Sequence, residues 1–372
     1  MNDLTWIEIK KQAIEDNISA FRSLVNIQTK LIPVIKSNAY GHGIDLIAKL
    51  LDQNKQVDYS AVVSGDEALQ LRQNNIKKPI IVLSFYQLEQ IDQLICNDIE
   101  FVVSNIEQLD NVVRLNKSCK VHLKFDIGTH RLGFCFDDID QIINQLNSSK
   151  VNIAGVFSHY ADSENEDQSL TDQQTRQFGQ ILDKLKANNI EPISHIACSA
   201  ATMSNKAHHF EAIRFGIALY GLKPSEIAIA RAKEHNDSFS LQPALSWYAK
   251  IINIHAVKAG DYIGYARGFN AEQDMRIATL PIGYWDGYNR LLSNQGEVII
   301  AGQKCKVVGK ICMNLTMVDI SNITEIKVGD RATLIGQDND CIITVDELAK
   351  KCQTINYEFV TRINQNIKRI LI

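Results

Sequence analysis

Hydrophobic and polar positions follow two different patterns along the chain, and the change falls near residue 235. Before that point, short apolar runs alternate with amphipathic segments in which apolar residues recur at helical spacing, as at Ile139, Ile142, Ile143 and Leu146. Strands that alternate with helices are typical of parallel strands joined by helical crossovers. The apolar runs lie at 31–35, 59–63, 80–84, 101–104, 121–126, 151–158, 193–197 and 212–221.

Eight strand–helix units in succession predict an α/β fold of the TIM type, a (β/α)8 barrel. A doubly wound open sheet is the competing interpretation, but no G-x-G-x-x-G sequence follows the first apolar run. A second amphipathic segment carries Phe178, Ile181, Leu182 and Leu185, and we expect Thr171 with Gln174 to form the capping box that opens its helix.

After residue 235 the sequence is rich in Val, Ile and Thr, and Gly and Asp punctuate it, as in "GEVIIAGQKCKVVGKICMNLTMVDI". This pattern predicts a second domain of mostly antiparallel strands, in which helical spacing returns only at 345–352. We expect the N-terminal strand to pair with it. The predicted domains are a barrel over 10–232 and a β domain over 233–372 that includes the strand 3–9.

Composition narrows the function classes only a little. Hydrophobic residues make up 45% and charged residues 22%, as in ordinary soluble proteins, and the net charge of −4 gives no reason to expect nucleic acid or an anionic membrane as a partner. No apolar run approaches the ~20 residues that span a bilayer. The start resembles no signal peptide, so we expect a cytoplasmic protein. None of the eight cysteines forms a C-x-x-C pair, and we predict no metal site.

The chemistry of a (β/α)8 barrel lies at the carboxyl ends of its strands. The predicted strands place five polar residues there: Lys36, Lys124, His159, Ser199 and Arg214. A lysine at that position either forms a salt bridge or, when desolvated beside other cations, becomes a neutral amine able to form a Schiff base.

The segment "CSAAT" (198–202) offers Ser199 and backbone amides, and "RFGIALYG" (214–221) offers the amides of Gly216 and Ile217 beside Arg214. These groups suit a phosphate, although small residues at a helix start are also ordinary packing. A reactive lysine with a phosphate cradle is the layout that a pyridoxal 5'-phosphate (PLP) enzyme needs.

Several further motifs appear in a characteristic order: "VIKSNAYGHG", "KFDIGTHRLGF", "GVFSHYADS", "RFGIALYGLKPS", "GYAR", "PIGYWDGY", "GKICMN" and "INYE". With them, the whole chain resembles the alanine racemases, which are fold-type III PLP enzymes built from a barrel and a C-terminal β domain. The resemblance implies a homodimer in which the β domain of one subunit covers the barrel mouth of the other.

The resemblance also implies roles for the cofactor site. Lys36 carries PLP, Arg214 faces the pyridine nitrogen and His159 holds Arg214 in place. A guanidinium only donates hydrogen bonds, so the ring nitrogen stays unprotonated. The implied phosphate ligands are Tyr40, Ser199, the amides of Gly216 and Ile217, and Tyr357.

For the substrate, the resemblance implies interconversion of L-alanine and D-alanine by two bases, Lys36 on one face of Cα and Tyr265 on the other. Arg131 grips the substrate carboxylate, helped by the amide of Met313, and Tyr284 narrows the entrance. Lys124 is expected to be carbamylated and to orient Arg131. In a bacterium the product would serve peptidoglycan synthesis.

The chain departs from the family pattern at Cys198, Asn314 and the pair Ile127 and Thr129, so a broader-spectrum racemase acting on serine or longer side chains is the first alternative. A decarboxylase of the same fold would place an acid, not Arg214, against the pyridine nitrogen. A PLP-binding homeostasis protein would lack the β domain that bears Tyr265.

Overall fold

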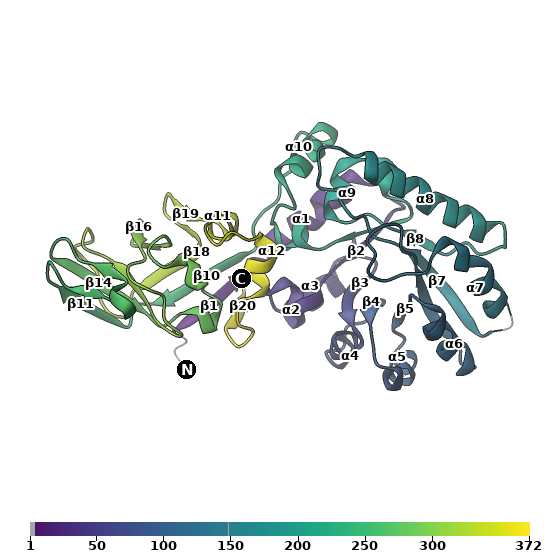
Figure 1. The fold of residues 1–372 in the computed structure, drawn as a ribbon, viewed down its shortest axis with the longest axis horizontal. Coiled ribbons are helices and arrows are strands. Elements are labelled where there is room, and N and C mark those ends of the chain that lie inside the picture. Colours follow the sequence, from purple (N-terminus) through teal and green to yellow (C-terminus); the bar gives the residue numbers. More distant parts are fainter. Residues whose placement is uncertain (1–3, 148) are drawn as a thin grey trace. The chain divides into compact units, whose positions relative to one another are not determined.

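The computed structural model describes residues 4–147 and 149–372, and these residues form two compact units (Figure 1). The barrel unit comprises Gln12–Ala39 and Ile44–Gln242. The β unit comprises the residues up to Lys11, the segment Tyr40–Gly43 and Pro243–Ile372.

The barrel unit contains an eight-stranded parallel sheet in the order β2-β9-β8-β7-β6-β5-β4-β3. The sheet closes where Val34, just after β2, bridges Ala61 of β3 in parallel, and the Ile35 amide donates to the Ala61 carbonyl at 2.8 Å. All eight predicted strands are therefore present, and the predicted TIM-type barrel is confirmed. The strands are β2 (Lys30–Pro33), β3 (Ser60–Ser64), β4 (Ile80–Phe85), β5 (Glu100–Val103), β6 (Cys119–Lys124), β7 (Val151–Phe157), β8 (Ile193–His195) and β9 (Ala212–Phe215).

Helices surround these strands (Figure 1). In α7 the predicted stripe of Ile139, Ile142, Ile143 and Leu146 is buried throughout. The helices are α1 (Lys11–Leu24), α3 (Ile44–Gln53), α4 (Gly65–Gln73), α5 (Ile91–Cys96), α6 (Ile106–Arg114), α7 (Ile139–Leu146), α8 (Ser169–Lys186), α9 (Ser199–Ser204) and α10 (Glu226–His235).

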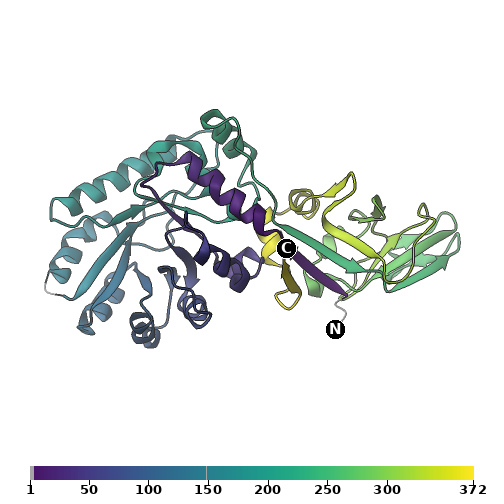
Figure 2. The same ribbon diagram turned by 180° about the vertical axis from the view of Figure 1, so that it is seen from behind.

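The β unit is built on a seven-stranded sheet whose main path runs β16-β15-β18-β10-β1-β20, with β19 paired to β18. The N-terminal strand β1 pairs with β10 in antiparallel fashion, as predicted, and Figure 2 shows it running beside strands that lie far away in sequence. The strands of this sheet are β1 (Thr5–Ile9), β10 (Leu245–Lys250), β15 (Glu297–Ile300), β16 (Gln303–Lys306), β18 (Arg331–Asp338), β19 (Cys341–Ile343) and β20 (Lys368–Leu371).

Two smaller antiparallel sheets complete the β unit, and the prediction of a mostly antiparallel domain is confirmed. They comprise β11 (Asn253–Val257), β14 (Met275–Leu280) and β17 (Thr316–Asp319) in one sheet, and β12 (Tyr262–Ile263) and β13 (Phe269–Asn270) in the other. Helix α11 (Val345–Lys351) follows the predicted pattern, whereas α12 (Asn356–Thr361) was not predicted, because one and a half turns carry too little periodicity.

The predicted capping box at Thr171 is wrong. Helix α8 begins at Ser169, and the Thr171 hydroxyl donates to the Asp162 carbonyl at 3.3 Å. Gln174 is fully buried; its amide donates to the Ile127 carbonyl at 3.0 Å and accepts from the Ala161 amide at 3.1 Å. Both side chains therefore bind loops of the barrel instead of their own helix, a tertiary use that local sequence does not reveal.

Gly155 of β7 allows a polar side chain into the barrel wall. It pairs with His122 of β6 next to an irregularity in the register, and His122 is buried. A Cβ atom at position 155 would collide with the imidazole of His122. Glycine is required here for space, not for backbone freedom.

We expect Gly155→Ala to destabilise the barrel by about 1–3 kcal/mol, because the methyl group overpacks a site that has no room. Gly179→Ala is the matched control: Gly179 lies inside α8 with nothing within 4 Å of its added Cβ, and alanine there should stabilise by about 0.5–1 kcal/mol. Urea unfolding followed by circular dichroism measures both. Equal shifts of the two midpoints in the same direction would contradict this account of Gly155.

Candidate active site

Lys36 opens a left-handed turn that follows strand β2. Ser37, Asn38, Ala39 and Tyr40 all have φ between 53° and 55°, so the short element α2 (Lys36–Tyr40) is not an ordinary helix. This conformation costs about 1–2 kcal/mol per residue for L-amino acids. Such a run of strained residues persists only where its surroundings hold it.

A carboxylate and an amide hold this turn inside the barrel unit. The Glu67 carboxylate accepts the Ser37 amide at 2.6 Å and the Val63 amide at 3.0 Å. The Asn38 side chain accepts the Ile44 amide at 2.9 Å. Glu67 thereby fixes the backbone next to Lys36 and also places a negative charge near its amine.

Four cations, Lys36, Lys124, Arg131 and Arg214, gather at the carboxyl ends of the strands. Burial lowers the pKa of Lys36, the charge of Arg131 lowers it further, and Glu67 opposes both. Lys124, the last residue of β6, is buried, and its pKa falls to about 8 because of burial and the nearby charges of Arg131 and Arg214. Both amines are therefore easier to deprotonate than ordinary lysines.

The loop that carries Arg131 is preformed around Asp126. The Asp126 carboxylate accepts backbone N–H groups from Gly128, Thr129, His130 and Arg131 at 2.9–3.2 Å. Partial burial opposes ionisation, but these four donors hold the pKa of Asp126 below its usual value. Gln174, through the Ile127 carbonyl, ties the same loop to α8. Arg131 itself is exposed and available to a ligand.

Arg214 of β9 is buried and donates to groups on neighbouring strands. Its Nη1 donates to the His195 ring and to the His195 carbonyl, each at 2.7 Å. Its Nη2 donates to the Ser158 carbonyl at 2.7 Å and the Ile196 carbonyl at 3.2 Å, and lies 3.4 Å from Nδ1 of His159. Among the residues that the structure describes, none accepts from Nε. The Nε–H group is the donor left for a ligand.

The imidazole of His159 is neutral beside Arg214. Burial and the positive charges of Arg214, Arg131 and Lys124 lower its pKa to about 3. A neutral imidazole can accept the hydrogen bond that an arginine offers. His159 is thus a weaker partner of Arg214 than His195, which lies closer and which the sequence did not single out.

Ser199 and Gly216 bring two helix starts together. The Gly216 amide donates to the Ser199 hydroxyl at 3.2 Å. Ser199 is the first residue of α9, and Ile217 is the first of the 3-10 turn Ile217–Tyr220. The first amides of a helix have no acceptor within it, so both starts present free N–H groups to an anion.

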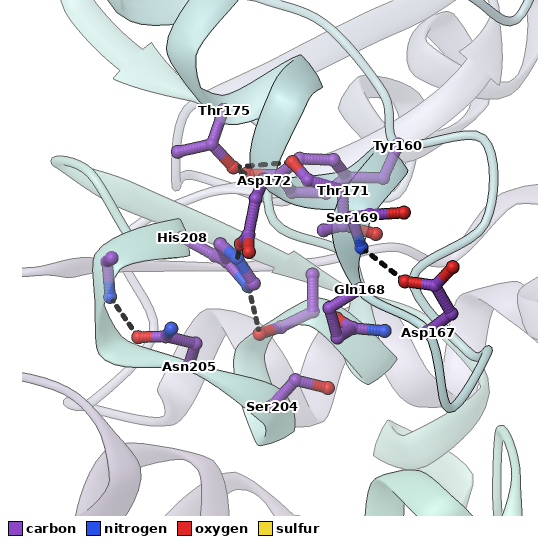
Figure 3. A network of polar contacts seen from close by, with 12 residues as sticks. Tyr160, Asp167, Gln168, Ser169, Thr171, Asp172, Thr175, Ser204, Asn205 and His208 are labelled. Atoms are coloured by element: carbon purple, nitrogen blue, oxygen red, sulfur yellow. Dashed lines mark hydrogen bonds and ion pairs between the residues drawn. The ribbon is translucent and has the colours of Figure 1, made fainter.

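Polar contacts hold the C-terminal turn of α9 in place (Figure 3). The carbonyls of Ala201 and Thr202 face the imidazoles of His208 and His209, at 3.3 and 2.9 Å. His208 also lies 3.6 Å from the Asp172 carboxylate of α8. This network ties the last turn of the Ser199 helix to the barrel wall.

In the β unit, Tyr40 and Tyr357 lie together, with ring centroids 6.3 Å apart. Arg369 holds the turn next to Tyr40, since its Nε and Nη2 donate to the Gly41 carbonyl at 3.1 and 3.0 Å. The two predicted phosphate tyrosines, from the first motif and from "INYE", are therefore neighbours.

The remaining predicted residues lie on one group of turns in the β unit. Tyr265 is 71% exposed, on a turn that packs against Lys310. The Tyr284 amide donates to the Cys312 carbonyl at 3.1 Å, which places Tyr284 next to Met313. Tyr284 and Met313 are exposed as well.

The positions that depart from the family pattern have local partners. The Cys198 thiol lies 3.1 Å from the Ser163 hydroxyl. Asn314 forms a side-chain hydrogen bond with Asp286, and Thr129 joins the ring of donors around Asp126. Cys198, Asn314 and Thr129 thus each have a hydrogen-bonding partner.

The chain is similar to known proteins over its whole length. It matches the families described as alanine racemase, N-terminal domain (residues 9–224) and alanine racemase, C-terminal domain (residues 244–371). An alanine racemase of Methanococcus maripaludis is 36% identical, over 98% of each chain, and one of Leptospira interrogans is 35% identical, over 99% of this chain and 96% of its own.

Solved structures agree. An alanine racemase of Clostridium difficile 630 superposes with a TM-score of 0.93 at 32% identity, covering 100% of this chain and 96% of its own. An alanine racemase of Bacillus anthracis with bound L-Ala-P superposes with a TM-score of 0.91 at 32% identity and the same coverage. The chain therefore belongs to the alanine racemase family.

Proposed function

We propose that this chain is a PLP-dependent racemase that interconverts L-alanine and D-alanine. The observation that carries the proposal is the gathering of Lys36, Lys124, Arg131 and Arg214 around the carboxyl ends of the barrel strands, where burial and the neighbouring positive charges lower the pKa values of the two lysines. The relatives compared above carry the name alanine racemase, which does not favour the broader-spectrum alternative.

The residues present fit PLP. Two buried cations, Lys124 and Arg214, beside Lys36 and Arg131 favour an anionic ligand, and PLP carries a phosphate and a phenolic oxygen. Ser199 and the amides of Gly216 and Ile217 suit the phosphate, with Tyr40 and Tyr357 as further donors. The unused Nε–H of Arg214 suits an acceptor such as a pyridine nitrogen, and His159 supports Arg214.

When bound, PLP draws electrons away from the Cα atom of an attached amino acid and so acidifies its Cα–H bond. The chain itself must then move the proton. Lys36 supplies an amine that burial and Arg131 make easier to deprotonate than an ordinary lysine, and it is proposed as the base on one face of Cα. A single base would return the proton to the side it left, and Tyr265 is proposed as the acid–base group on the opposite face.

Substrate selection falls to residues of both units. Arg131, on the loop preformed by Asp126, is proposed to bind the substrate carboxylate together with the amide of Met313. Tyr284 is proposed to narrow the entrance. Because Lys124 would repel Arg131 as an ammonium, we propose that it is carbamylated: its pKa of about 8 leaves part of the amine neutral, the form that reacts with CO2.

We propose a homodimer in which the β unit of one subunit, residues 233–372 with the strand 3–9, brings Tyr265 to the barrel of the other, residues 10–232. Large apolar side chains are exposed on the β unit, and such a surface favours contact with a partner subunit. Trp285 is 63% exposed, Leu291 56% and Met313 54%, and all three lie beside the turns that carry Tyr284 and Tyr265. In the cytoplasm of a bacterium the enzyme would supply D-alanine for peptidoglycan.

The first test incubates the PLP-loaded enzyme with a panel of L-amino acids and separates the products by chiral chromatography. We expect L-alanine to reach an equal mixture of enantiomers. Lys36→Ala and Tyr265→Phe should each lower kcat by about 10²–10⁴-fold, the usual contribution of an acid–base group. Tyr262→Phe, an exposed tyrosine of the same hairpin, is the matched control and should keep kcat within about twofold.

Preferential racemisation of serine or a longer substrate would favour the broader-spectrum alternative. Wild-type activity of both Lys36→Ala and Tyr265→Phe would refute the two-base proposal.

The second test seeks the carbamate on Lys124. After equilibration with 13C-bicarbonate, we expect a carbamate carbon signal in the NMR spectrum that is lost in Lys124→Ala and kept in Lys120→Ala. Lys120 lies on the same strand, but its hydrogen bond to Asp98 raises its pKa, so its amine stays protonated. The signal should weaken as pH falls below 7, because protonation removes the neutral amine. A bare amine on Lys124 at neutral pH would refute the proposal.

The third test asks whether the site is shared. Lys36→Ala and Tyr265→Ala subunits are co-expressed with different tags, and the mixed dimer is purified. If the two groups come from different subunits, one of the two sites in each mixed dimer is intact, and its activity should be about half that of the wild-type dimer. A mixed dimer as inactive as its parents would place both groups on one subunit.

A further inference from the structure

A chain of hydrogen bonds leads from Arg214 into the barrel and ends at a buried carboxylate. Nη1 of Arg214 lies 2.7 Å from Nδ1 of His195. Nε2 of His195 lies 2.9 Å from Nδ1 of His122, and Nε2 of His122 lies 2.7 Å from the Glu100 carboxylate. The four residues come from β9, β8, β6 and β5.

The residues of this hydrogen-bond series are buried, and the surrounding side chains leave space for them. His195 is fully buried, His122 is 1% exposed and Glu100 is 5% exposed. The ring of Phe157 stacks on His195 at 5.0 Å, and Gly155 leaves the space that His122 occupies. A buried polar chain of this kind is costly unless all of its members are satisfied.

One arrangement of protons satisfies every link. Arginine only donates, so Nδ1 of His195 must accept, and a neutral His195 then carries its hydrogen on Nε2. That hydrogen is donated to Nδ1 of His122, which leaves the hydrogen of His122 on Nε2. This second hydrogen is donated to the Glu100 carboxylate, which accepts it as an anion.

The other arrangements place two hydrogens in one short contact. A second proton on His195 would face the guanidinium of Arg214, and a second proton on His122 would face Nε2–H of His195. Glu100 protonated on the oxygen that faces His122 would donate in the reverse direction and end in the same conflict at Arg214. Burial and the charge of Arg214 also hold the pKa of His195 well below its ordinary value, in agreement with a neutral ring.

We propose that Glu100 is a positioning residue for Arg214: through two neutral imidazoles of fixed tautomer, its carboxylate orders the hydrogen bond that holds the guanidinium. The inference rests on the proposed role of Arg214 at the PLP ring nitrogen. Glu100, His122 and His195 would touch neither substrate nor cofactor, and they act only through Arg214. Lys120, whose Nζ lies 3.9 Å from the other oxygen of Glu100, is not part of this hydrogen-bond series.

The kinetic test compares Glu100→Gln, which keeps an acceptor oxygen and loses the charge, with Glu100→Leu, which loses both. Lys120→Ala is the control beside the same carboxylate. Turnover per bound PLP, KM for L-alanine, PLP content and the thermal midpoint are measured for each. Because charged hydrogen bonds are stronger than neutral ones, Glu100→Gln should lower kcat by about 3- to 10-fold, and Glu100→Leu by about 100-fold.

KM should stay near the wild-type value in Glu100→Gln, since Arg131, not Arg214, is proposed to bind the substrate carboxylate. Its thermal midpoint and PLP content should stay close to those of Lys120→Ala. Unchanged turnover in Glu100→Gln overturns the proposal. So does a loss confined to stability and PLP content, because that is the result of a purely structural role.

The tautomers are read independently in the wild-type protein by long-range 1H–15N correlation of 15N-labelled histidines, assigned with His122→Gln and His195→Gln. Both rings should be neutral with hydrogen on Nε2. A hydrogen on Nδ1 of either ring overturns the proposal. This measurement needs neither racemase activity nor a foldable Glu100 variant, so it separates failure of this inference from failure of the proposed function.

Discussion

Arg214 is buried within the barrel, and it can only donate hydrogen bonds. That constraint decides the state of its neighbours. The carbonyls of Ser158, His195 and Ile196 accept from it, and His195 and His159 must remain neutral so that their rings can accept as well. An acceptor bound at the remaining Nε–H would also be kept from holding a proton. The electrostatic character of the site follows from one guanidinium that cannot change its role.

The positive charges at the barrel mouth repel one another, and this repulsion favours the binding of an anionic ligand. Burial, and after it the charge of Arg131, lowers the pKa values of Lys36 and Lys124, and Arg214 lowers that of Lys124 further. A ligand that brings negative charge relieves this repulsion, and binding to the folded state alone stabilises that state. The strained turn after Lys36 is preorganised as well, because hydrogen bonds to Glu67 and Asn38 fix its backbone without a ligand.

Much of the barrel could be predicted from the sequence, because strands buried on both faces appear as short apolar runs and the helices carry clear periodicity. Lys36 could be placed at the barrel mouth because it directly follows such a run, and Arg214 because it is the charged residue within the last one. His122, His195 and Glu100 could not be recognised, since a polar residue within a strand gives no sign of the strand across the barrel that it contacts. The capping box predicted at Thr171 and Gln174 was wrong for the same reason: the partners of these side chains are loops distant in sequence. The left-handed turn at 37–40 also had no local signal, because none of its residues is glycine.

Two lysines at the barrel mouth have lowered pKa values, and we propose opposite chemistry for them: Lys36 would bind the cofactor and Lys124 would be carbamylated. Borohydride reduction of the PLP-loaded enzyme, followed by proteolysis and mass spectrometry, tests this assignment most directly. We expect a pyridoxyl group on the peptide that contains Lys36 and none on the peptide that contains Lys124. A pyridoxyl group on Lys124, or unmodified Lys36 in fully loaded enzyme, would contradict it.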